Sequence, residues 1–174
     1  MRSATRFVTT LAAPTMAAGL GLFWLVGGDR KFAVIALVAV LLIYAANTCQ
    51  WFARDCLQVM VVVHLYLGMA ADFYHTLFWF DELFHVLAMA WLTAIFVRRF
   101  EALGLVSTSV LAITLSLALG AGWEIFEFAI DSAFQLGAQQ GLLDTNFDLI
   151  ADGVGGLLAA VFLTVSPVTA RSAH

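Results

Sequence analysis

Two apolar stretches near the end of the chain contain acidic residues at helical spacing. Glu124 and Glu127 are three positions apart, whereas Asp144, Asp148 and Asp152 follow one another at four-residue steps. Side chains with these spacings lie one above another on the same face of an α-helix. We therefore predict two acidic ridges, one on each helix, that face each other.

Asp81 and His85 form a second pair in an earlier apolar stretch. A carboxylate one helical turn from an imidazole can orient the ring as a metal ligand or tune it as a general base; Asp81 can also cap its helix. A carboxylate at the bilayer centre costs about 2.5 to 3.5 kcal/mol, and neighbouring carboxylates repel one another. The acidic groups therefore need protonation, a bound cation or a water-filled pocket.

The composition places these residues in a membrane protein. The 174-residue chain is 63% hydrophobic and 11% charged, whereas soluble domains average about 45–50% and 25%. Six spans of about 20 residues use almost the whole length. We predict a single all-α integral membrane domain, residues 1–174, built as a polytopic transmembrane helix bundle. The net charge of −4 and the lack of a basic cluster argue against nucleic acid as a partner.

The apolar runs predict where the six spans lie, with one sizeable loop over residues 131–146. The spans are residues 7–27, 32–52, 57–77, 83–97, 104–130 and 147–165. In this arrangement, one side of the membrane receives Arg2, Arg6, Arg54, Arg98, Arg99 and Arg171, and the other receives Arg30 and Lys31. The positive-inside rule then predicts that both termini are cytoplasmic and that the acidic residues lie near the extracytoplasmic boundary.

Helix starts and close helix contacts explain some of the same residues without any chemistry. Thr145 and Asp148 have the spacing of a capping box, and Asp144 can begin a helix. Asp152 lies a turn or more inside its span, and no helix end requires Glu124. These last two residues therefore favour a site. The small residues of the last two spans, Gly153, Gly155 and Gly156 among them, are expected to permit close helix contact.

Several short motifs occur in a distinctive order. They are Phe80-Asp81-x-x-x-His85, Trp123-Glu124-Ile125-Phe126-Glu127-Phe128, LGAQQG over residues 136–141, and Asp144-Thr145-x-x-Asp148 with Gly155 behind it. Over residues 80–160 this order resembles that of the YjdF-like bacterial inner-membrane proteins and, more distantly, that of the VanZ-like membrane proteins. The resemblance implies a multi-pass protein of the bacterial inner (plasma) membrane, but no particular reaction. Glu82 departs from the family pattern, which has Arg there, so an internal counter-ion is missing.

We predict that the acidic residues and the histidine converge near the outer membrane boundary and bind a divalent metal ion. Mg²⁺, Mn²⁺, Zn²⁺ and Fe²⁺ all suit oxygen ligands with one imidazole. A catalytic site would use Glu124, Asp152 and His85 in metal-dependent hydrolysis or group transfer on a lipid or lipid-linked envelope substrate. The predicted ligands are Asp81, His85, Glu124, Glu127, Asp148 and Asp152.

Two other functions fit the same residues. A small ion- or proton-coupled transporter would use the acids and His64 to bind and release ions, and a homo-oligomer could complete it. A non-enzymatic ligand-binding or scaffold protein would use the acids only to hydrogen-bond helices together, and His64 alone also fits this role.

The third predicted span places His64, Asp72 and His75 on one helical stripe. Asp72-x-x-His75 and Glu82-x-x-His85 also share the three-residue spacing of the Glu-x-x-His helices in di-iron bundles. Four-residue patterns of this kind are common, so the di-iron interpretation is the weakest of those considered.

Overall fold

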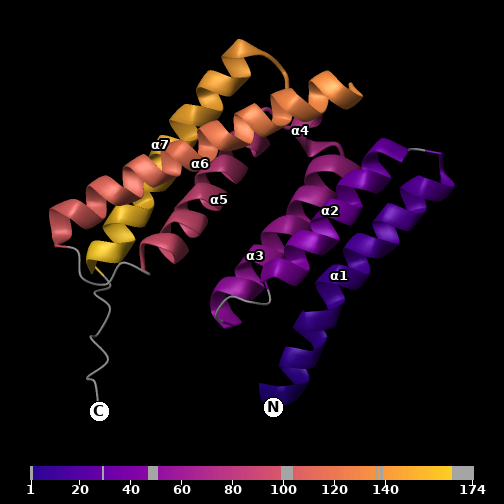
Figure 1. Cartoon of the computed structure of the whole chain (residues 1–174), viewed down its shortest axis with the longest axis horizontal. Coiled ribbons are helices and arrows are strands. Elements are labelled where there is room, and N and C mark those ends of the chain that lie inside the picture. The colour runs from indigo at the N-terminus through magenta and orange to yellow at the C-terminus, as the bar shows by residue number, and fades with distance from the viewer. Residues whose placement is uncertain are drawn as a thin grey trace. The chain divides into compact units, whose positions relative to one another are not determined.

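The computed structural model is all-α and describes residues 2–28, 30–46, 51–98, 104–135, 137 and 139–165 (Figure 1). This confirms the predicted fold class. The chain forms two compact units, Met1–Phe78 and Trp79–His174. Three helices of the second unit are long and apolar enough to cross a membrane. Six spans, a single domain and cytoplasmic termini stay predictions; Arg99 and Arg171, which count toward that orientation, lie outside the described residues.

The first unit is built from helices that pack around a small apolar core. Its elements are α1 (Arg2–Val26), α2 (Arg30–Ala46), α3 (Trp51–Val63), the π-helix η1 (His64–Ala70) and α4 (Phe73–Thr76). α1 and α2 lie against each other after a turn at Gly28, whose φ of 85° favours glycine. The buried core consists of Ala17, Trp24, Ala36, Ala39, Ile43 and Leu65.

The third predicted span is not one continuous helix. Regular α-helix gives way to the π-helix at His64, and the π-helix ends at Ala70. Asp72 then adopts a left-handed conformation with φ of 60°, and only the short α4 follows. The predicted single stripe through His64, Asp72 and His75 is therefore wrong, because equal spacing aligns side chains only while the backbone stays regularly helical.

The fold of this segment is fixed by contacts that bring α4 back over η1. A side chain at Gly68 would collide with the ring of Tyr74. His64 Nδ1 lies 2.6 Å from the Tyr74 hydroxyl. This confirms the prediction that His64 is hydrogen-bonded to a residue of another helix.

The second unit consists of three long helices. They are α5 (Phe80–Val97), α6 (Leu105–Phe134) and α7 (Leu142–Val165), and α7 packs against both of the others (Figure 1). α6 continues past the predicted end at Ile130, and α7 begins before the predicted start at Phe147. The connection shrinks to residues 135–141 because Asp131 and Asp144 both lie in helix, where composition alone suggested a loop.

Two adjacent glycines allow α7 to lie close to both neighbouring helices. A Cβ added at Gly155 would be 2.7 Å from the carbonyl oxygen of Val86 on α5. A Cβ added at Gly156 would be 2.8 Å from the Cβ of Ser116 on α6. The predicted role of these glycines in close helix contact is confirmed, whereas Gly153 would make only an ordinary contact.

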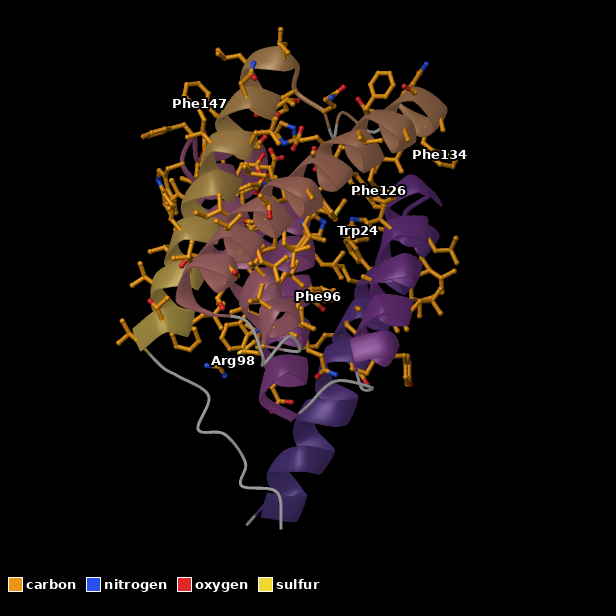
Figure 2. The ribbon with its side chains drawn as sticks, turned by 60° about the vertical axis from the view of Figure 1, so that its left-hand side comes forward. Trp24, Phe96, Arg98, Phe126, Phe134 and Phe147 are labelled. Atoms are coloured by element: carbon orange, nitrogen blue, oxygen red, sulfur yellow. The ribbon has the colours of Figure 1, made fainter. Side chains whose placement is uncertain are left out.

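The interior of the second unit is apolar at one end and polar at the other. The apolar core contains Ala94, Val97, Ala112, Ala159, Ala160 and Leu163. Buried polar residues toward the other end include His85, Glu124, Asp148 and Asp152. The outward faces carry exposed apolar side chains, such as Phe126, Phe134 and Phe147 (Figure 2), as expected for helices in contact with lipid.

Candidate metal site

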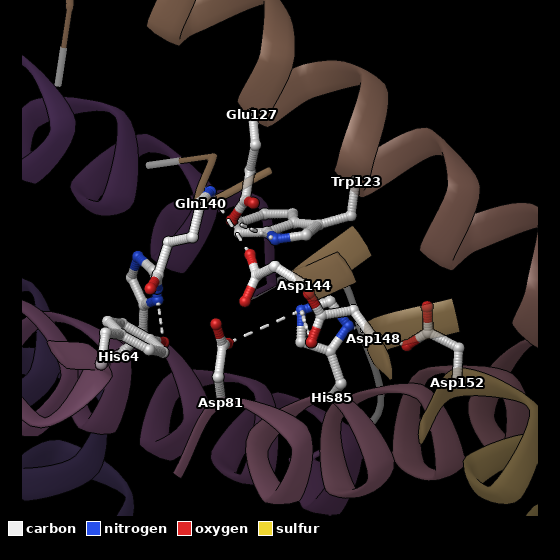
Figure 3. A network of polar contacts seen from close by, with 10 residues as sticks. His64, Asp81, His85, Trp123, Glu127, Gln140, Asp144, Asp148 and Asp152 are labelled. Carbon is white, nitrogen blue, oxygen red and sulfur yellow. Dashed lines mark hydrogen bonds and ion pairs between the residues drawn. The ribbon is translucent and has the colours of Figure 1, made fainter. Parts of the chain in front are cut away.

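All six predicted ligands come from the three helices of the second unit. α5 supplies Asp81 and His85, α6 supplies Glu124 and Glu127, and α7 supplies Asp148 and Asp152. Figure 3 shows Asp81, His85 and Asp148 grouped together, with Asp152 beyond the histidine ring. Asp148 and Asp152 on α7 and Glu124 on α6 are all buried, as two facing acidic ridges require.

His85 is the centre of the group, and only 4% of the residue is exposed. Its Nδ1 lies 2.9 Å from Oδ1 of Asp152, which is a hydrogen-bond distance. Its Nε2 lies 3.8 Å from Oδ1 of Asp81 and 3.9 Å from Oδ1 of Asp148. These two distances are too long for hydrogen bonds, so Nε2 faces both carboxylates without bonding to either of them.

The spacing of these donor atoms fits a metal ion. One atom each from Asp81, His85 and Asp148 lie within 4.8 Å of one another. Two ligands that bind the same ion at about 2.1 Å lie at most about 4.2 Å apart. The distances from Nε2 to the two carboxylates already satisfy this limit, and the carboxylates need only small rotamer adjustments.

Glu124 lies buried near this group without a hydrogen-bond partner. Only 5% of the residue is exposed, and neither carboxylate oxygen has a partner within the described part of the chain. It follows Gly120 by one helical turn, and Gly120 faces the side chain of Asp152, so Glu124 lies on the face of α6 that is turned toward α7. An uncompensated buried charge costs several kcal/mol. The pocket therefore requires a cation or a proton beside Glu124.

Glu127 and Asp144 are held by contacts within their own segments. Oε1 of Glu127 accepts a hydrogen bond of 2.8 Å from the indole N–H of Trp123, one turn earlier on α6. Oδ2 of Asp144 accepts a long contact of 3.4 Å from the backbone N–H of Gln140. Both acids are partly exposed, and Figure 3 shows Asp144 between Glu127 and the group formed by Asp81, His85 and Asp148.

Asp144 lies in the first turn of α7, as its predicted place at a helix start requires, but the other two helix-cap interpretations are not supported by the structure. Thr145 and Asp148 lie inside α7, which begins at Leu142, so the predicted capping box is wrong. The residue that caps α5 is Trp79, and its side chain makes no capping hydrogen bond. Asp81 instead lies in the first turn, with its carboxylate toward His85.

The two predicted di-iron spacings do not form one site within the described residues. Asp72 and His75 contact each other at 2.6 Å, and both side chains are exposed. Within the same described ranges, the only group of three residues with metal-site geometry is Asp81, His85 and Asp148. Asp152 contacts the opposite ring nitrogen of His85, so its role as a direct ligand stays a prediction.

Two residues beside the site, Ser116 and Gly120, were not identified from the sequence as members of it. They count only among the small residues expected at helix contacts. The Ser116 hydroxyl donates a hydrogen bond of 2.6 Å to the backbone carbonyl of Asp152. Gly120 faces the side chain of the same residue. Ser116, Gly120 and Glu124 follow one another at four-residue steps on α6. A serine and a glycine on the same face of an apolar helix as an acid are the signal that could have identified Ser116 and Gly120 from the sequence.

Comparison with known proteins gives a family but no characterised relative. Residues 5–167 match a family described as "Predicted membrane protein (DUF2238)". No curated protein and no solved structure matches the chain.

Proposed function

Because the chain belongs to the DUF2238 family of predicted membrane proteins, we propose that it is a multi-pass inner-membrane protein that binds one divalent metal ion between α5, α6 and α7. The observation that supports this most directly is the Nε2 atom of His85, which faces Asp81 and Asp148 at 3.8 and 3.9 Å. The unpartnered carboxylate of Glu124 is an independent reason to expect a positive charge in the same pocket.

The donor set favours a transition metal over Mg²⁺. Asp81 and Asp148 supply one oxygen each, and His85 supplies an imidazole nitrogen. Mg²⁺ is bound mainly by oxygen ligands and water, whereas imidazole suits Zn²⁺ and Fe²⁺, and Mn²⁺ accepts both. Glu124 would either complete the coordination or remain free to activate a water molecule bound to the metal.

The position of the site along the helices suits a substrate at the membrane surface. His85 is about 8 Å from the start of α5, and Asp148 is about 9 Å from the start of α7. Glu124 is about 15 Å from the end of α6. With both termini in the cytoplasm, this end of the unit would face the extracytoplasmic side. The exposed apolar faces of α6 and α7 leave the surroundings lipid-like.

We therefore infer metal-dependent hydrolysis or group transfer on an ester or phosphate of a lipid or lipid-linked substrate. A metal bound there would supply Lewis-acid polarisation of the reacting ester or phosphate oxygen. Glu124 would take the proton from the attacking water or hydroxyl group and return it to the leaving oxygen as the ester or phosphate bond breaks. A scaffold role is less well supported, because acids that only join helices should hydrogen-bond across them. Glu124 makes no such bond to any described residue.

Metal content of the purified full chain tests the proposal. After loading with Zn²⁺ or Mn²⁺ and removal of excess ion in detergent, we expect about one bound metal per chain by mass spectrometry. His85→Ala and Asp148→Asn should lose nearly all of it, because each removes one of the three donor groups that lie within 4.8 Å of one another.

Asp72→Asn is the control, because it makes the same Asp-to-Asn change at an exposed carboxylate of the first unit that also lies beside a histidine. It should retain full metal content. The proposal is wrong if the wild-type chain binds no metal, or if His85→Ala and Asp148→Asn bind as much as the control.

A further inference from the structure

The buried carboxylate of Asp152 lies on the opposite side of His85 from the proposed metal. The residue is fully buried, and its Oδ1 lies 2.9 Å from Nδ1 of the ring. A carboxylate at this distance accepts a hydrogen bond from Nδ1–H, and in the neutral ring this tautomer leaves the lone pair on Nε2, toward Asp81 and Asp148. Metal-binding histidines commonly have such a partner, which fixes both the tautomer and the orientation of the ring.

Two residues of α6 that are one helical turn apart, Ser116 and Gly120, contact Asp152. The Ser116 hydroxyl donates to the backbone carbonyl of Asp152 at 2.6 Å and so holds the main chain of α7 at this level. At Gly120, the space that a Cβ would take is already filled by Oδ2, Cγ and Cβ of Asp152. Any side chain at position 120 would therefore displace the carboxylate that holds His85.

Taking the proposed metal site as given, we propose that Asp152 and Gly120 are positioning residues that act through His85. Asp152 holds the ring with Nε2 toward the ligand pocket, and Gly120 keeps empty the volume that the Asp152 carboxylate needs. The three atoms nearest to a Cβ built at Gly120 all belong to Asp152, so an effect of this position on the metal would be transmitted from α6 through α7 to α5.

The chain contains a matched control for Gly120. Gly122 is exposed on the same helix, and a Cβ added there would meet nothing within 4 Å. Gly120→Ala and Gly122→Ala make the same chemical change two positions apart. A general effect of alanine on the helix would appear in both variants, whereas displacement of Asp152 would appear only in the first.

The test combines metal affinity with nitrogen-15 NMR of the histidine side chains in the detergent-purified full chain. Zn²⁺ affinity is measured by competition with a chromophoric chelator, and His85→Gln identifies the resonances of His85. In the wild type we expect an Nδ1 proton of His85 that exchanges slowly with water. Gly120→Ala should lose this protection and bind Zn²⁺ about tenfold to a hundredfold more weakly. Gly122→Ala should match the wild type in both measurements.

Asp152→Asn provides a second variant of nearly the same size, which keeps the inference testable even if Gly120→Ala does not fold. It should weaken Zn²⁺ binding and lose the protected proton, because a neutral amide is a poorer acceptor and can donate to the ring instead. The inference is overturned if Asp152→Asn, or a folded Gly120→Ala, keeps both the affinity and the protected proton. A wild type that binds no Zn²⁺ but shows the protected proton would refute the metal proposal alone.

Discussion

The two ends of the α5–α6–α7 unit use the same helices for opposite purposes. At one end, small apolar side chains such as Ala112 and Ala159 fill the space between helices and need no partner. At the other end, His85, Glu124 and Asp152 are equally buried, but some of their polar atoms have no partner within the described residues. Under the proposal made above, the apolar end would hold the helices in place while the polar end keeps ionisable groups ready for a metal ion.

The largest effect is expected when a carboxylate is introduced at the apolar end. This change tests whether the two ends differ in their tolerance of a buried charge. Ala159 is 1% exposed and has only apolar residues in its core cluster. We expect Ala159→Asp to destabilise the chain by about 3–5 kcal/mol, because its charge would be buried without compensation. The yield of monodisperse protein and the thermal midpoint in detergent measure this. A stable Ala159→Asp variant would show that the two ends do not differ in their tolerance of charge.

A substitution at the helix crossing tests whether the two ends depend on the same close contact. Gly155→Ala would bring a methyl group against the main chain of α5 at Val86 and Ala90, which cannot move aside as a flexible side chain can. We expect a loss of about 1–3 kcal/mol in unfolding free energy together with weaker metal binding. Gly153→Ala, with only an ordinary contact to Leu117, is the control. Equal stability of the two variants would contradict the close contact.

The effect expected for Glu124 is no larger than that for Gly155→Ala, but it is the most specific to the polar end. Glu124→Gln removes a buried charge that has no hydrogen-bond partner among the described residues. Without metal, the variant should be more stable than the wild type by about 1–3 kcal/mol. With saturating Zn²⁺ the order should reverse, because the wild type gains more from the ion. Thermal unfolding with chelator and with Zn²⁺ measures both, and a variant that is less stable under both conditions would argue against a charge kept for a cation.

The residues of the candidate site could be predicted because acids inside apolar helices stand out. Asp81 and His85 are neighbours on one helix, so their contact follows from spacing alone. Which acids lie on each side of the ring depends on how α5 and α7 are rotated about their axes. Asp148 faces Nε2 and Asp152 faces Nδ1, and no spacing within one helix contains that information.

The errors in the predicted fold have a common physical cause. Hydropathy marks where apolar residues end, but hydrogen bonds decide where a helix ends. The polar residues from Asp131 to Asn146 read as a loop, yet backbone hydrogen bonds continue at both of its ends. Conversely, the apolar third segment hides a change to π-helix at His64 and a left-handed residue at Asp72. Neither feature alters the composition of the segment.

The adjacent glycines of α7 have a consequence for the angular phase of that helix. Successive residues of an α-helix point about 100° apart, and Gly155 and Gly156 each meet a different neighbour at close range. Rotation of α7 by one residue in either direction would replace at least one of these glycines with a bulkier side chain. The same phase sets where Asp148 and Asp152 point. Because they lack side chains, Gly155 and Gly156 thus fix the rotation of α7. That rotation determines which ring nitrogens of His85 the carboxylates on α7 can reach.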